Sequence, residues 1–156
     1  MDILFKELKD ASYYAEQLPG SAEIKATFST KACQVHLSAW VAATANKIII
    51  ELRSDKKQIA HVRLWTVEGN GAITAHGNSP VTWVSRSFQT TKLLSWPTHI
   101  ALAMNTEKDE LILNPGETVR LVITVYTNHD TESWKNKAIS AVSYTHLRAH
   151  ETRHDL

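Results

Sequence analysis

The sequence predicts an all-β fold, an antiparallel β-sandwich over residues 21–140 that follows a short amphipathic helix over residues 1–20. Three observations support this prediction. After Ser21, apolar and polar residues alternate along roughly eight segments, which is the period of half-buried strands. Turn residues separate these segments about every ten residues, as in sandwiches and barrels. The first twenty residues instead follow the period of a helix with one apolar stripe.

The N-terminal helix is predicted from a narrow apolar seam. Apolar residues recur at alternating steps of four and three, charged residues lie between them, and Pro19-Gly20 ends the pattern. Such a seam would either dock on the domain that follows or pair with a second copy as a short coiled coil, which would give a homo-oligomer. The seam consists of Leu4, Leu8, Ala11, Ala15 and Leu18.

The segments after Ser21 are predicted as strands because each is bounded by turn residues. The isoleucine run at 48–50 is β-branched and short, which favours a buried strand. Asn70-Gly71 lies between two alternating runs and predicts a hairpin. The predicted strands are Glu23–Ser29, Cys33–Val41, Lys47–Leu52, Gln58–Val67, Val81–Thr90, His99–Asn105, Leu111–Leu113 and Thr118–Tyr126.

The last predicted strand has the clearest alternation. Its apolar positions predict that Leu121 and Ile123 are buried between the two sheets, whereas Arg120 and Thr124 belong to the other face. Substitution to Ala should therefore cost far more at the first two positions than at the second two.

A short segment at the start of this strand resembles known modules. The turn Asn114-Pro115-Gly116-Glu117 leads into an alternating strand. The nine residues from Leu113 to Leu121 resemble the entry to a late strand in immunoglobulin-like and jelly-roll modules, which recur in bacterial surface proteins and in phage tail and fibre proteins. The resemblance implies the same sandwich class and a place in a larger surface or phage-tail-type protein.

Residues 141–156 are predicted to be a non-native tail. The string from Val142 to Glu151 resembles one reading frame of the transposase-type adaptors used in sequencing libraries. The resemblance implies that the tail lies outside the core and that the natural gene continued past Ser140. His146, His150 and His154 recur every four residues and imitate a zinc site on one helical face. The adaptor frame accounts for them, so no metal site is predicted.

Composition excludes several classes of partner. Lys and Arg number 17 against 16 Asp and Glu, for a net charge of +1, so the chain lacks the basic excess of nucleic-acid-binding proteins. No apolar stretch approaches transmembrane length, and no signal peptide is visible at Met1, so membrane insertion is not expected and the compartment stays open. Cys33 is the only cysteine, which excludes an intrachain disulfide and favours a small buried residue.

Catalytic motifs are absent from the sequence. There is no nucleophile elbow, no His-Glu-x-x-His and no phosphate-binding glycine loop. The acidic residues between Gln34 and Tyr126 lie in or beside predicted turns, except Glu51, whose face the pattern does not resolve. We therefore expect no enzyme and no cofactor. A fragment of a hydrolase stays an alternative, since a site can assemble from distant residues.

Five tryptophans provide the positive functional signal. Trp65 shares strand parity with His61 and Arg63, opposite the apolar set of the same strand, and Trp40 lies on the polar side of its own strand. Outward indoles beside Arg and His suit stacking on a sugar or a protein contact. The alternative is that a tryptophan fills the core under a helix or loop. The predicted binding residues are Trp65, Arg63, His61 and Trp40.

The function expected from these observations is a non-catalytic structural or binding module that contacts a protein or a glycan surface. The first alternative is a carbohydrate-binding module that uses exposed tryptophans as its platform. The second is the hydrolase fragment, which would need two carboxylates facing one another across a groove.

Overall fold

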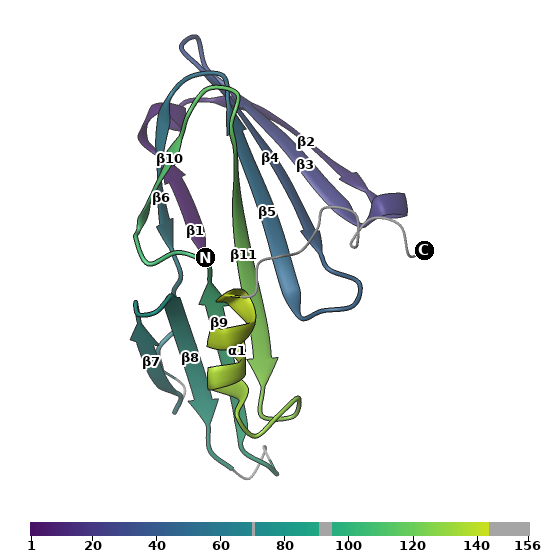
Figure 1. Ribbon diagram of the computed structural model, residues 1–156, viewed down its shortest axis with the longest axis vertical. Coiled ribbons are helices and arrows are strands. Elements are labelled where there is room, and N and C mark those ends of the chain that lie inside the picture. Colours follow the sequence, from purple (N-terminus) through teal and green to yellow (C-terminus); the bar gives the residue numbers. More distant parts are fainter. Residues whose placement is uncertain (70, 91–94, 144–156) are drawn as a thin grey trace. The chain divides into compact units, whose positions relative to one another are not determined.

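The computed structural model describes residues 1–69, 71–90 and 95–143, and most of these residues lie in antiparallel strands (Figure 1). The chain divides into two compact units. Unit 1 contains Met1–Arg63 and Lys108–Val122, and unit 2 contains Leu64–Glu107 and the described residues from Ile123 onward. The predicted all-β class is confirmed.

Unit 1 is built from two antiparallel sheets. The smaller sheet has the order β1-β6-β10, and the larger has the order β2-β3-β4-β5-β11, with the first half of β11 in this unit. The strands are β1 (Asp2–Phe5), β2 (Ser12–Leu18), β3 (Glu23–Ser29), β4 (Gln34–Val41), β5 (Lys47–Ser54), β6 (Gln58–Arg63), β10 (Glu110–Leu113) and β11 (Thr118–Thr127).

The two sheets of unit 1 share an apolar core because each has one alternating face. Val35 and Leu52 of the larger sheet are buried, as are Ala60 and Val62 of the smaller one. The alternate residues of β6, such as His61, are exposed. This pattern is that of a β-sandwich, in which each strand points every second residue inward. Other buried members of this core are Ile50, Leu113 and Leu121.

Unit 2 combines a sheet with a helix. The sheet has the order β11-β9-β8-β7, formed by β7 (Ile73–Gly77), β8 (Thr82–Phe88), β9 (Thr98–Met104) and the second half of β11. The helix α1 (Trp134–Ser143) packs on β9. Small side chains permit this close approach, because Ala101 and Ala103 of β9 and Ala138 of α1 are fully buried.

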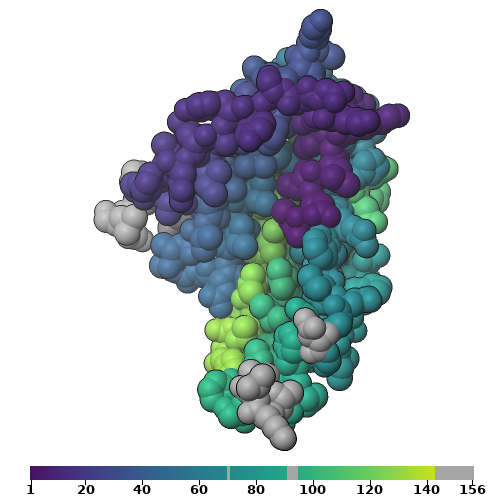
Figure 2. All heavy atoms as spheres, turned by 180° about the vertical axis from the view of Figure 1, so that it is seen from behind, coloured from purple at the N-terminus to yellow at the C-terminus, as the bar shows by residue number. Residues whose placement is uncertain are grey.

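The predicted N-terminal helix over residues 1–20 is wrong. These residues form β1, a 3-10 turn at Lys6–Leu8, β2 and a second 3-10 turn at Pro19–Ser21. β1 pairs with β6, and β2 pairs with β3 along its whole length. Leu4, Ala15 and Leu18 of the predicted seam therefore lie in paired strands, because pairing with distant strands overrides the local spacing. A homo-oligomer through a helical seam loses its basis; Figure 2 shows these N-terminal strands (purple) at the surface.

The prediction of a hairpin at Asn70-Gly71 is wrong, because the strands before and after it, β6 and β7, do not pair with each other. β6 ends at Arg63, four residues before the predicted end, and pairs with β1 and β10. β7 pairs with β8 in a different sheet. Asn70 lies outside the described residues, but Gly69 and Gly71 both have positive φ, and the Gly69 carbonyl accepts a hydrogen bond from the Ala72 N–H. The glycines thus form a tight turn in a connection between sheets.

The predicted tail has its first residues in α1. Val142 is fully buried, so the expectation that the segment starts outside the core is wrong at this residue. From the sequence, no helix is expected here, although Trp134, Ala138 and Val142 recur at the four-residue step of one helical face. Residues 144–156, including His146, His150 and His154, lie outside the described residues.

Burial along β11 agrees with the prediction at three of the four residues. Leu121 and Ile123 are buried and Arg120 is exposed, as predicted. Thr124 is also completely buried, which the alternation does not predict. In unit 2 the second face of β11 is covered: the Thr124 hydroxyl donates a 2.7 Å hydrogen bond to the Ala138 carbonyl of α1.

Candidate functional site

The outward face of the larger sheet in unit 1 gathers polar side chains from every strand. Residues that pair across adjacent strands lie on the same face, so the strand registers define its rows. We call this surface the polar face. Its rows are Tyr14, Thr27, His36 and Arg53; then Glu16, Lys25, Ser38 and Glu51; then Leu18, Glu23, Trp40 and Ile49.

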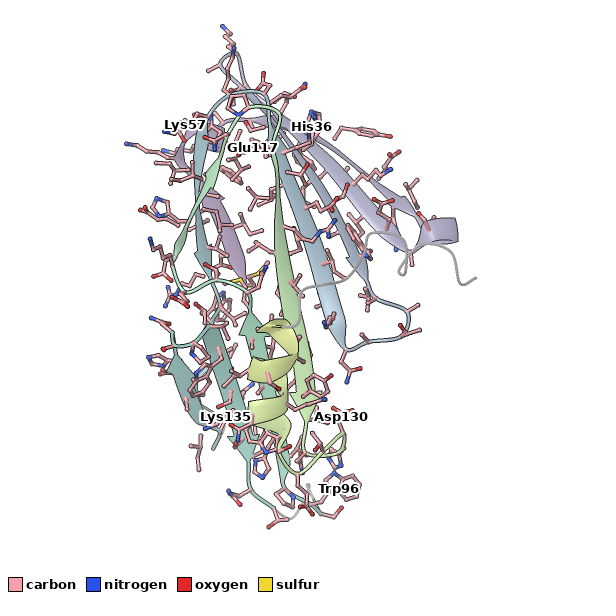
Figure 3. All side chains as sticks on the ribbon, viewed as in Figure 1. His36, Lys57, Trp96, Glu117, Asp130 and Lys135 are labelled. Carbon is pink, nitrogen blue, oxygen red and sulfur yellow. The ribbon has the colours of Figure 1, made fainter. Side chains whose placement is uncertain are left out.

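An open depression of about 670 Å³ lies over the end of the polar face where β5 ends and β11 begins. It is lined by side chains of β4 and β5 and by the start of β11. Figure 3 shows His36 of β4 and Glu117, which precedes β11, at the same end of unit 1. The lining residues are His36, Ser38, Glu51, Leu52, Arg53, Ser54, Asp55, Gly116 and Thr118.

The carboxylates in this depression already have partners. Glu51 accepts hydrogen bonds from Arg120, whose Nε lies 3.0 Å from the Glu51 Oε1. Asp55 accepts a 2.7 Å hydrogen bond from the backbone N–H of Gln34. The structure therefore resolves the face of Glu51, which points outward on β5 and pairs with β11. Both carboxylates serve to fix the walls of the depression.

Two basic side chains lie opposite one another in the same depression. His36 and Arg53 are cross-strand partners and both are exposed. The His36 Nδ1 lies 3.0 Å from the Thr27 hydroxyl oxygen, which leaves its Nε2 for another group. Among the residues that the structure describes, no hydrogen bond or ion pair engages the Arg53 guanidinium. An Arg and a His with open donor positions can bind an acceptor-rich ligand.

Trp40 extends the polar face beyond the depression. It is half-buried and lies two residues from Ser38 on the same side of β4, about 7 Å along the strand. Its cross-strand neighbours on that face, Glu23 and Ile49, are both buried. The polar face thus passes from charged and hydroxyl groups to an indole and an apolar end.

Three of the four predicted binding residues lie on the two sheets of unit 1. His61 and Arg63 are exposed on the outward face of the smaller sheet, and His61 Nδ1 lies 3.6 Å from Glu110. Trp65 is 45% exposed but follows the end of β6 and belongs to unit 2. Trp40 lies on the opposite outer face of the unit 1 sandwich from His61 and Arg63. Strand parity alone does not place these four side chains together.

Three other tryptophans lie in unit 2, and two of them contact α1 residues or belong to it. Lys135 Nζ lies 5.1 Å above the Trp83 ring, and Trp134 stacks on His99 with 5.6 Å between ring centroids. These rings help to seat α1 on the sheet. Trp96, labelled in Figure 3, is 57% exposed and meets His129 edge to face.

Lys47 at the start of β5 has a pKa that shifts clearly. It shares the outward parity of Ile49, and its burial lowers the pKa of its amine below the ordinary value of 10.5, because removal from water disfavours the charged form. The amine lies at the apolar end of the polar face, away from the depression.

Two properties of the described residues concern metal ions and membranes. No group of three or more His, Cys, Asp or Glu side chains in residues 1–69, 71–90 and 95–143 is arranged to hold a metal ion. Within those same residues, no helix has the length and apolar character to cross a membrane. Cys33 is buried, as predicted, beside the Thr30 hydroxyl.

Both carboxylates of the depression accept hydrogen bonds from groups of the protein itself. Glycosidases place two carboxyl groups roughly 5–9.5 Å apart across the scissile bond. Glu51 lies in β5 and Asp55 directly follows the strand, so their Cα atoms are at most about 13 Å apart, and each carboxylate accepts a hydrogen bond within the protein. No known protein family and no curated protein matches the chain.

Proposed function

We propose that the chain is a non-catalytic β-sandwich binding module that recognises a glycan through the polar face of unit 1. One observation carries the proposal: Trp40 lies on the same sheet face as the depression that His36, Ser38 and Arg53 line. Sugars present both apolar ring faces and many hydroxyl groups, so they suit a surface with an indole and with mixed donors and acceptors.

A glycan fits this surface better than a protein partner does. Protein contacts concentrate their binding energy in aromatic and Arg anchors within desolvated pockets. Here the depression is open, charged and hydroxyl side chains contribute to its lining, and the Trp40 indole lies beyond it on the same sheet face. The surface thus offers many polar contacts and one stacking platform.

The immunoglobulin-like or jelly-roll assignment, and a place in a larger surface or phage-tail-type protein, are parts of the same proposal. The sandwich of unit 1 supports them, because such modules display ligand sites on the outward faces or ends of their sheets.

A glycan array with the full chain tests the proposed function. We expect binding to a subset of glycans, and we expect Trp40→Ala to abolish it while Trp96→Ala, a matched change at an exposed indole of unit 2, leaves it intact. Circular dichroism and melting curves check that each variant is folded. Loss of binding with Trp65→Ala but not with Trp40→Ala would instead support the surface predicted from strand parity. An array without any binding would refute the proposal.

A further inference from the structure

The depression on the polar face contains a cationic side chain, Arg53, that no described residue pairs with. Glu51 is paired with Arg120, and Asp55 accepts the Gln34 N–H. Within the part of the chain that the structure describes, the Arg53 guanidinium has neither an ion pair nor a hydrogen bond. Arg53 is thus the charged group of this depression that is available to a ligand.

His36 makes the same position more favourable for an anion. It lies directly across from Arg53 in the β4–β5 register, and directly opposed residues bring their Cβ atoms within about 5.5 Å. Thr27 holds the imidazole through Nδ1, so the Nε2 side can face a bound group. The hydroxyls of Ser38 and Thr118 add uncharged partners to the lining.

We propose that this depression is a subsite for an acidic sugar, one that carries a carboxylate or a sulfate group. The guanidinium of Arg53 binds two oxygens of the anionic group, as its planar fork matches that geometry, and His36 contacts a third position through Nε2. Ser38 and Thr118 contact the sugar hydroxyls. This assignment rests on the proposed glycan-binding function and names the class of sugar that the polar face selects.

Titration calorimetry on the full chain with matched oligosaccharides tests the assignment. The probes are an oligogalacturonate, its neutral methyl ester, a sulfated dextran oligomer and plain dextran of equal length. We expect the acidic probes to bind at least about tenfold more tightly than their neutral counterparts, which is the value of one charge-assisted contact. The two acidic arms distinguish carboxylate from sulfate.

Two variants connect the effect to Arg53. Arg53→Gln should lower the affinity for the acidic probe about tenfold and leave the neutral probe unchanged, and Arg53→Lys should recover part of the loss, since it keeps the charge without the fork. Lys9→Gln removes the same charge at an exposed position before β2, outside the polar face, and should change affinity less than twofold.

The outcomes separate this inference from the proposed function. Equal binding of acidic and neutral probes would refute the acidic subsite while glycan binding stands. Equal losses with Arg53→Gln and Lys9→Gln would also refute it, because the preference would then be a general attraction between charges. Failure of all four probes, together with an empty glycan array, would refute the proposed function itself.

Discussion

The buried hydroxyl of Thr124 should stabilise the contact between α1 and the sheet of unit 2. The side chain is fully buried, and its hydroxyl lies 2.7 Å from the Ala138 carbonyl and 3.5 Å from the Ala103 carbonyl. Thr124→Val replaces the hydroxyl with a methyl group and so removes the hydrogen-bonding group. Because the two side chains have nearly the same size, the substitution leaves no large cavity.

The expected loss of unfolding free energy depends on whether the carbonyls near Thr124 keep another hydrogen-bond partner. A net hydrogen bond is worth about 0.5–1.5 kcal/mol, and a buried acceptor left without any partner costs about 1–3 kcal/mol. The Ala138 carbonyl lies within α1, where the helical pattern supplies it with a second partner, so the upper range does not apply. The added methyl group offsets part of the loss by less than about 0.8 kcal/mol. We expect Thr124→Val to lower the free energy of unfolding by about 1 kcal/mol.

Urea denaturation followed by far-UV circular dichroism measures this change through the midpoint at constant slope. Thr118→Val is the matched control, because Thr118 is exposed at the start of the same strand and should shift stability by less than about 0.5 kcal/mol. Indistinguishable midpoints for the two variants would refute the role assigned to the buried hydroxyl.

Three further changes test the packing described here. Leu121→Ala should cost about 2–5 kcal/mol through lost burial and a cavity, and a cost below 1 kcal/mol in urea denaturation would place Leu121 outside the core. Val142→Ala should lower the free energy of unfolding by about 2 kcal/mol. An unchanged urea midpoint would mean that Val142 lies outside the core, as the predicted tail does. Lys47→Met should raise the melting temperature at neutral pH. Because the folded pKa of Lys47 is lowered, the wild-type chain gains stability as pH rises toward 10.5, so the advantage of Met should shrink there; a constant advantage contradicts this account.

The sequence predicted the strands whose signals are local. β3 spans the predicted residues, and β11 extends the prediction by one residue, because alternation and flanking turns act within each segment. The N-terminal segment shows the limit of this reasoning. Its spacing fits a helical seam, yet β1 pairs with β6 through the register Asp2 to Arg63, a contact between residues far apart in the chain. Local spacing carries no information about such a partner.

The same limit explains the candidate site. Strand parity correctly placed Trp40 with His36 and Ser38, because all three lie in one strand. It could not place Arg53 opposite His36 or Arg120 beside Glu51, because these pairs depend on registers between strands. Thr124 is likewise buried because α1 packs against its side of β11. The alternation within the strand gives no sign of this helix.

Arg120 and Arg53 should have different roles, the first in stability and the second in binding. Arg120 holds Glu51, whose side chain is 28% exposed, so Arg120→Gln should cost up to about 1 kcal/mol by leaving that carboxylate without its charge partner. Arg53 has no partner among the described residues, so Arg53→Gln should change the free energy of unfolding by less than about 0.5 kcal/mol. Urea denaturation of the two variants in parallel measures the difference. If Arg53→Gln costs as much as Arg120→Gln, the guanidinium supports the fold, and it is not free to bind an acidic sugar.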